Sequence, residues 1–234
     1  MKLLGAFERP YYAVTTPFVN WLIRSGVRPN TITTVGTGFV IASAVAYGTG
    51  HLRTGGALLL FSGILDTLDG QVARGGAMTT RFGAFYDSTI DRVGDGATFI
   101  GLGAWMLYAP DVAYRNVGII LCMVAILSSL LVSYARARAE GLHIDCKVGI
   151  AQRAERVLGL GLATLLVGAG PRGLVLQALV AVLTLASVIT VVQRFLYVRR
   201  VADAMDAADK AETQAAARAA GARRAPLDTL AKGQ

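Results

Sequence analysis

The chain reads Asp66-Thr67-Leu68-Asp69-Gly70-Gln71-Val72-Ala73-Arg74 and, after eight further residues, Gly83-Ala84-Phe85-Tyr86-Asp87-Ser88-Thr89-Ile90-Asp91. This stretch, called the Asp66–Asp91 segment below, holds four carboxylates at fixed spacing. It lies in a strongly apolar sequence, where ionised groups are most costly to keep. Another group must therefore compensate these charges.

The composition predicts a membrane protein with several spans. Of the 234 residues, 54% are hydrophobic, and the mean hydropathy is +0.52. Both values exceed those of a usual soluble domain, and the apolar residues form long blocks. We expect no cleavable signal peptide, because Lys2, Glu8 and Arg9 interrupt the first ten residues.

Six apolar blocks predict six transmembrane helices, at about Ile32–Tyr47, Gly55–Ala73, Phe82–Tyr108, Val117–Tyr134, Val157–Gly168 and Leu174–Leu196. A span needs about twenty residues, and several blocks are short or interrupted by glycine, so their boundaries are less defined than their number. We expect an all-α membrane domain over residues 1–200 and a polar, Ala/Arg-rich cytoplasmic tail over residues 201–234.

An interfacial amphipathic helix is predicted before the first block. Residues 11–24 place apolar and aromatic side chains at helical spacing, namely Val14, Phe18, Trp21 and Leu22. A plain packing helix is the alternative. Arg28-Pro29-Asn30-Thr31 then breaks the pattern and offers a cap for the first transmembrane helix.

The basic residues predict the orientation. With the N-terminus in the cytoplasm, the outer connections contain only Arg53, Arg115 and Arg172, and the remaining twenty of the 23 Lys and Arg lie on the cytoplasmic side. We therefore expect a multi-pass protein of the cell membrane with the Asp66–Asp91 segment facing the cytoplasm. The net charge of +8 reflects this topology and attracts anionic lipid and substrate, so nucleic acid is not an expected partner.

Zinc and triad chemistry are not expected. The two cysteines, Cys122 and Cys146, lack CxxC spacing, and the two histidines, His51 and His143, lie far apart without a nucleophile pattern.

The acids of the Asp66–Asp91 segment predict a divalent metal site. On helices, Asp87 and Asp91 are one turn apart, and Asp66 and Asp69 are neighbours at i and i+3. Hard oxygen ligands without Cys or His favour Mg²⁺ or Mn²⁺, and magnesium usually completes its shell with substrate phosphates. The alternative is that these acids are surface residues or ion-pair partners of nearby arginines, namely Arg74, Arg81 and Arg92.

The spacing Asp66-x2-Asp69-Gly70-x2-Ala73-Arg74-x8-Gly83-x3-Asp87-x3-Asp91 resembles the motif of the CDP-alcohol phosphotransferase family. The resemblance implies a six-helix membrane bundle, a homodimer, and transfer of a phosphatidyl group from CDP-diacylglycerol to an alcohol with release of CMP. It assigns two metal ions to Asp66, Asp69, Asp87 and Asp91, with Asp91 also the general base. It assigns the CDP-lipid nucleotide to Pro29, Asn30, Thr31, Ile32, Gly70, Ala73, Arg74 and Thr80.

Arginines near the fourth to sixth blocks suggest that the accepted alcohol carries a phosphate, and argue against choline or ethanolamine. The surrounding segments look similar to the phosphatidylinositol phosphate synthase branch of the family, whose acceptor is inositol phosphate, although Arg136 replaces an expected Lys and Ala154 an expected Pro. That resemblance implies contacts to the acceptor phosphate from Ser133, Arg136, Arg153, Arg156 and Arg194.

Four other functions are alternatives at this stage. Phosphatidylglycerophosphate synthase and archaetidylinositol phosphate synthase would use the same chemistry on another substrate. An intramembrane prenyltransferase would also use Asp-rich helices and Mg²⁺, and a cation transporter could use intramembrane carboxylates. Metal-dependent release of CMP from CDP-diacylglycerol separates the first two from the last two.

Overall fold

The protein is built from helices throughout the part that the computed structural model describes, which is residues 15–150 and 153–231, with side chains up to residue 215. The main elements are α2 (Pro29–Gly48), α3 (Leu52–Gly75), α4 (Arg81–Tyr108), α5 (Arg115–Glu140), α6 (Arg153–Leu166), the short 3-10 helix η1 (Pro171–Gly173) and α7 (Leu174–Ala231). A further helix is present over residues 15–24, and no strand occurs in the described ranges. The all-α prediction is confirmed.

Five of the six apolar blocks lie within one of the helices α2 to α7, and the block Val157–Gly168 extends two residues beyond the end of α6. Three segments among the described residues are long and apolar enough to cross a membrane, namely Pro29–Gly48, Arg115–Glu140 and Pro171–Ala215. Helices α3 and α4 are more polar because they carry the Asp66–Asp91 segment, and α6 has 14 residues, fewer than a usual span. The helices thus support a membrane protein.

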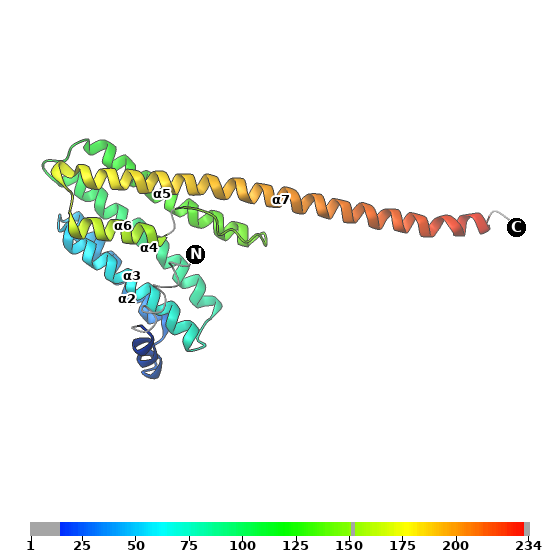
Figure 1. Cartoon of the computed structure of the whole chain (residues 1–234), viewed down its shortest axis with the longest axis horizontal. Coiled ribbons are helices and arrows are strands. Elements are labelled where there is room, and N and C mark those ends of the chain that lie inside the picture. Colours follow the sequence, from blue (N-terminus) through cyan, green and yellow to red (C-terminus); the bar gives the residue numbers. More distant parts are fainter. Residues whose placement is uncertain (1–14, 151–152, 232–234) are drawn as a thin grey trace, which may run out of the picture.

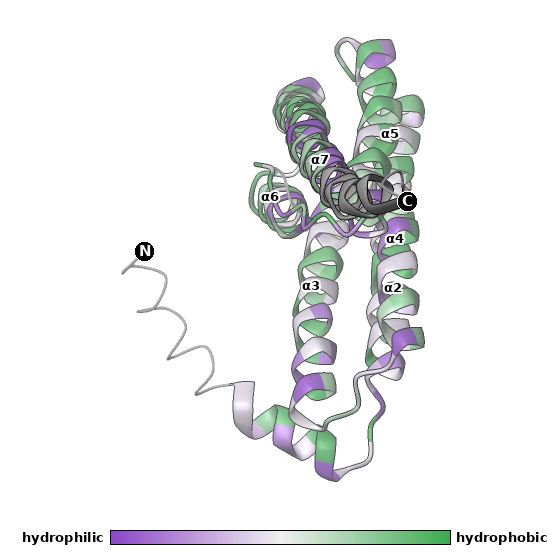
Figure 2. Cartoon of the chain, turned by 90° about the vertical axis from the view of Figure 1, so that its right-hand side faces the viewer, coloured by the Kyte–Doolittle hydropathy of each residue, from purple (hydrophilic) through white to green (hydrophobic). Residues whose placement is uncertain are grey.

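The bundle is assembled from neighbouring helix pairs: α2 packs on α3 and α4, α3 on α6, α4 on α5, and α5 on α7 (Figure 1). The largest fully buried side chains come from several of these helices, and include Tyr47, Leu59, Leu102, Met106, Leu160 and Leu176. Figure 2 shows hydrophobic residues along α5, and hydrophilic residues toward the lower end of α3. The Asp66–Asp91 segment, which begins in the second half of α3, therefore lies toward one end of the bundle.

Small residues bring α3 and α6 close together in antiparallel orientation. A Cβ atom on Gly56 would lie 2.7 Å from the carbonyl oxygen of Gly161, and one on Gly63 would lie 3.1 Å from Val157. A side chain at Gly56 would force the two backbones apart, and one at Gly63 would press on Val157. Following the same pairing along α3 brings Asp66 to the level of Arg153 on α6, as the ion pair between them confirms.

A buried hydrogen bond ties the opposite end of the bundle. The hydroxyl groups of Tyr47 on α2 and Thr164 on α6 lie 2.8 Å apart, and Ser43 donates to the carbonyl oxygen of Gly55 at 2.7 Å. These contacts satisfy buried polar groups far along the helices from the Asp66–Asp91 segment.

The start of α2 differs from the sequence expectation. The helix begins at Pro29, so Asn30 and Thr31 lie within its first turn, and Arg28 at the cap position makes no side-chain capping bond. Proline is suited to this first position because its fixed φ matches the helix and its missing N–H would have no helical partner there.

The helix over residues 15–24 packs one side against the bundle, where Val19 joins a buried cluster with Ile32, Leu68 and Val72. Phe18 and Trp21 stack at 5.7 Å between ring centroids and are exposed. The predicted Val14 lies outside the described residues.

The C-terminal helix α7 runs through residue 200 without a break and continues to Ala231, well away from the bundle (Figure 1). Its residues from 203 to 215 are exposed. Before it, the connection from α5 to α6 folds back on α7, where Ile144 and Cys146 are buried against Tyr197 and Val201.

Candidate functional site

Three of the four motif acids meet between α3 and α4. Asp66 and Asp69 lie near the end of α3, and Asp87 lies near the start of α4. One carboxylate oxygen from each of these three residues lies within 4.8 Å of the other two. The helix pair and its short connection therefore bring the carboxylates together as the sequence predicts.

This acid triad fits a divalent metal ion. The Oδ1 atom of Asp87 is buried and accepts no hydrogen bond from the described residues. Asp69 is buried as well, and its Oδ2 atom accepts a 2.6 Å hydrogen bond from the Thr33 hydroxyl on α2. A divalent cation would stabilise carboxylates with unused acceptor capacity, and a donor set of oxygen atoms alone suits Mg²⁺ or Mn²⁺.

The fourth motif acid, Asp91, contacts arginines. Its Oδ1 atom lies 2.9 Å from Nη1 of Arg153, and its Oδ2 atom lies 3.3 Å from Nη2 of Arg92. The same Nη1 atom of Arg153 lies 2.7 Å from Asp66 Oδ1. Ion pairs therefore compensate part of the negative charge of these acids. The pair with Arg92 agrees with the alternative interpretation of the sequence, whereas Arg153 was not among the arginines named there.

A cavity of about 220 Å³ lies between the first turn of α2, the end of α3 and the start of α4. Six of the eight residues expected to hold the nucleotide line it, namely Pro29, Asn30, Gly70, Ala73, Arg74 and Thr80. Asp69 and Asp87 line it as well. Thr31 is exposed outside this lining, and Ile32 is buried in the cluster with Val19.

Two glycines, Gly70 and Gly83, line the cavity of about 220 Å³. A Cβ atom on Gly70 would lie 3.3 Å from Nη1 of Arg74, and one on Gly83 would lie 3.0 Å from Oγ1 of Thr80 and 3.2 Å from Oδ1 of Asn30. Thr80 caps α4 by accepting a 2.9 Å hydrogen bond from the Gly83 backbone N–H. Side chains at these two positions would press on Arg74, Thr80 and Asn30, which also line the cavity.

A second cavity, of about 560 Å³, lies on the other side of the acid triad. All five residues expected to contact the acceptor phosphate line it, namely Ser133, Arg136, Arg153, Arg156 and Arg194. Asp66, Asp87 and Asp91 line it too, so Asp87 borders both cavities. The arrangement places an arginine-lined cavity of about 560 Å³ and a cavity of about 220 Å³ on either side of one carboxylate cluster.

The arginines of this second cavity differ in their surroundings. Arg156 is buried and pairs with Asp95 at 2.5 Å. Arg194 is buried and donates from Nε to the Val148 carbonyl oxygen at 2.9 Å and from Nη1 to that of Val132. These two bonds tie α7 to α5 and to the connection that follows α5. Arg136 is exposed and pairs with Glu140 at 2.9 Å. Arg194 therefore also has a structural role in holding this wall of the cavity.

A family model, CDP-alcohol phosphatidyltransferase, matches residues 27–193, which include the acid triad and most of the lining of both cavities. The chain belongs to the CDP-alcohol phosphatidyltransferase family. Membership in this family argues against the prenyltransferase and transporter alternatives.

Two relatives in this family have names that bear on the substrate. The chain is 43% identical over 164 residues to archaetidylinositol phosphate synthase of Methanothermobacter thermautotrophicus, covering 69% of this chain and 79% of the relative. It is 38% identical over 226 residues to phosphatidylinositol phosphate synthase of Streptomyces avermitilis, covering 90% and 88%.

Solved structures of one family member are also similar. The crystal structure of Mycobacterium tuberculosis phosphatidylinositol phosphate synthase with CDP-DAG bound matches with a TM-score of 0.70 and 34% identity, covering 80% of this chain and 94% of that one. The structure of that protein in complex with manganese and citrate matches with a TM-score of 0.69, 34% identity and coverage of 79% and 88%.

Two residues of the site lie outside the predicted set. Asp95 follows Asp91 by one helical turn and is 6% exposed, so the i+4 spacing of Asp87, Asp91 and Asp95 was a usable signal. Thr33 had no such signal, because its role depends on the packing of α2 against α3.

Proposed function

We propose that this protein transfers the phosphatidyl group of CDP-diacylglycerol to a hydroxyl of inositol 1-phosphate, forming phosphatidylinositol phosphate and releasing CMP. The observation that carries this proposal is the single carboxylate cluster that borders two cavities, one lined by the residues expected to bind the nucleotide and the other by five arginines. The arginines suit an acceptor that bears a phosphate, because guanidinium groups bind phosphate through two parallel hydrogen bonds.

The metal ligands in this proposal are the four motif acids. Asp66, Asp69 and Asp87 form the triad, and Asp91 would join Asp66 at a second ion. Two Mg²⁺ ions, with Mn²⁺ as the alternative, would neutralise the diphosphate and stabilise the charge that develops in the displacement.

The protein groups then have distinct roles. Arg74 and the first turn of α2 bind the cytidine diphosphate part of the donor. The arginines of the second cavity orient the acceptor so that its hydroxyl faces the acid cluster. Asp91 takes the hydroxyl proton, the hydroxyl oxygen bonds to the lipid-bearing phosphorus, and the bond from that phosphorus to the CMP oxygen breaks.

The membrane arrangement is part of the same proposal. All six helices α2 to α7 cross the cell membrane within a domain over residues 1–200, and the end of α3 faces the cytoplasm. The exposed Phe18 and Trp21 support an interfacial position of the helix over residues 15–24. Two copies form a homodimer, as the family resemblance implies, and residues 201–234 extend into the cytoplasm.

A second candidate function differs only in the lipid. The 43% identity to an archaetidylinositol phosphate synthase favours an archaeal CDP-lipid as an alternative donor. The acceptor would be the same, and so would the roles of the acids and arginines.

One reconstituted assay tests the proposal. The purified protein in liposomes receives CDP-diacylglycerol and Mg²⁺, and inositol 1-phosphate, glycerol 3-phosphate, free inositol and serine are offered separately while CMP is measured. Release with inositol 1-phosphate alone is expected. Release with glycerol 3-phosphate alone would contradict the acceptor, and no metal-dependent release with either CDP-diacylglycerol or the archaeal donor would contradict the reaction.

A further inference from the structure

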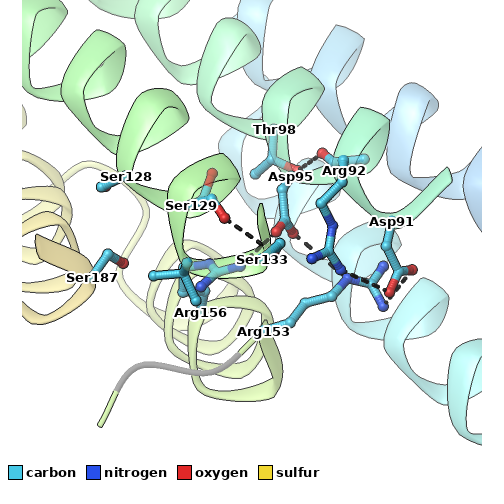
Figure 3. A network of polar contacts seen from close by, with 12 residues as sticks. Asp91, Arg92, Asp95, Thr98, Ser128, Ser129, Ser133, Arg153, Arg156 and Ser187 are labelled. Carbon is cyan, nitrogen blue, oxygen red and sulfur yellow. Dashed lines mark hydrogen bonds and ion pairs between the residues drawn. The ribbon is translucent and has the colours of Figure 1, made fainter. Parts of the chain in front are cut away.

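Asp95 is a buried acid that the four-acid motif does not include. It lies on α4 one turn beyond Asp91, and its side chain is 6% exposed. Its Oδ2 atom lies 2.5 Å from Nη2 of Arg156, and its Oδ1 atom lies 3.6 Å from Nε of Arg153. Figure 3 shows the Asp95 side chain extending from α4 toward Arg153 and Arg156 of α6.

The partner of Asp95 borders the acceptor cavity, whereas Asp95 is absent from the lining of that cavity. Arg156 is 4% exposed and comes from the first turns of α6. An arginine side chain has many rotamers, and a short charge-assisted hydrogen bond selects one of them. The ion pair with Asp95 is thus one contact that restricts the orientation of the Arg156 guanidinium.

The second arginine depends less on Asp95. Arg153 lies closer to Asp66 and Asp91, at 2.7 Å and 2.9 Å, than to Asp95. Asp95 is also outside the triad whose oxygens lie within 4.8 Å of one another. The geometry therefore connects Asp95 to the acceptor arginine Arg156 more directly than to the metal ligands.

We propose that Asp95 is a positioning residue for the acceptor: it holds Arg156 in the orientation that binds the acceptor phosphate, without contacting substrate or metal itself. This inference rests on the proposed function. It explains why an additional acid is kept buried near four others, since Asp95 compensates the charge of an arginine that must remain available to an anion.

The test compares steady-state kinetics of four proteins in liposomes: wild type, Asp95→Asn, Arg156→Gln and the double variant. Asp95→Asn is expected to raise KM for inositol 1-phosphate about ten-fold, as suits the loss of a charge-assisted hydrogen bond. KM for CDP-diacylglycerol should stay at the wild-type value. The double variant should have the same acceptor KM as Arg156→Gln alone, because Asp95 acts through Arg156.

Two controls separate this role from a general structural one. Tyr47→Phe removes a buried hydrogen bond far from the site, and Asp111→Asn removes an exposed acid paired with Arg172; neither should change the acceptor KM. Asp95→Glu keeps the charge and should recover part of the acceptor affinity.

Several results would overturn the inference. These are an unchanged acceptor KM in Asp95→Asn, additive effects in the double variant, or a loss of Mn²⁺ binding by Asp95→Asn as large as that of Asp66→Asn, which would make Asp95 a ligand. If Asp95→Asn does not fold, the double variant, which removes both charges, replaces it. A KM for inositol 1-phosphate equal to that of Arg156→Gln supports the inference, and a higher KM contradicts it. If the wild-type protein transfers nothing to inositol 1-phosphate, the proposed function fails. If the wild type is active and Asp95→Asn has the same KM for inositol 1-phosphate, only the positioning role is refuted.

Discussion

Arg153 of α6 forms an ion pair with Asp66 of α3, with 2.7 Å between the Nη1 atom of Arg153 and the Oδ1 atom of Asp66. The guanidinium thereby places a positive charge on a residue of the acid triad and also on Asp91, 2.9 Å away. A cation that binds these acids must compete with Arg153 for the same oxygens. Arg153 therefore links the acid cluster to the second cavity, which Asp66, Asp87 and Asp91 also line.

Replacing Arg153 should therefore change metal binding and transfer in opposite directions. Arg153→Gln removes the competing charge, so Mn²⁺ should bind more tightly by about 2- to 5-fold, the range for a partly exposed ion pair. Transfer to inositol 1-phosphate should fall, because the acceptor loses a cationic contact. Calorimetric titration with Mn²⁺ and the CMP assay measure the two effects, and weaker Mn²⁺ binding would contradict the competition.

The hydrogen bond from Thr33 to Asp69 gives a second prediction. Thr33→Val removes the donor of the 2.6 Å bond, and should weaken Mn²⁺ binding because Asp69 is no longer held in place. Loss of a hydrogen bond to a charged group should also lower the free energy of unfolding by about 1.5–3 kcal/mol. Thr184→Val, which removes a buried hydroxyl from α7, is the matched control and should leave Mn²⁺ binding intact. Equal Mn²⁺ affinity in the two variants would rule out this role for Thr33.

Two glycines of α4 provide a matched pair for the nucleotide cavity. In Gly83→Ala the new Cβ atom would lie 3.0 Å from Thr80 Oγ1 and 3.2 Å from Asn30 Oδ1, so KM for CDP-diacylglycerol should rise. In Gly96→Ala the Cβ atom meets nothing within 4 Å, and the helix should gain about 0.5–1 kcal/mol of stability with an unchanged KM. A rise in KM of similar size in both variants would indicate an effect of α4 as a whole.

The sequence predicted the parts of the fold and site that depend on local pattern. Apolar blocks located the helices. Helical spacing predicted that Asp66 and Asp69 share one helix face and that Asp87 and Asp91 share another, because residues three or four apart are neighbours on a helix. The structure brings Asp66, Asp69 and Asp87 within 4.8 Å of one another. The five acceptor residues, selected by resemblance, line one cavity.

Other features depend on contacts between distant helices. The Asp95–Arg156 pair joins residues 61 positions apart, and Arg153 reaches Asp66 because glycines let α3 and α6 approach. Ile32 is buried in a cluster with Val19 from the preceding helix, a contact that the sequence does not specify. Such contacts follow from packing geometry, which no local pattern encodes.

The role of Asp91 predicts a variant that folds without activity. Asp91→Asn keeps the shape of the side chain and removes its capacity to accept the hydroxyl proton, so transfer should fall by about 10²- to 10⁴-fold. Thermal unfolding and size-exclusion profiles should remain close to wild type. Normal turnover by a folded Asp91→Asn protein would refute the assignment of the base.

The most direct test of the central claim follows the acceptor into the product. Deuterium-labelled inositol 1-phosphate, CDP-diacylglycerol and Mg²⁺ are incubated with the reconstituted protein, and lipid extract and CMP are quantified by mass spectrometry. We predict one labelled phosphatidylinositol phosphate for each CMP released, and none after EDTA treatment. Release of CMP without labelled lipid, or labelled lipid formed without a divalent metal, would contradict the proposed transfer.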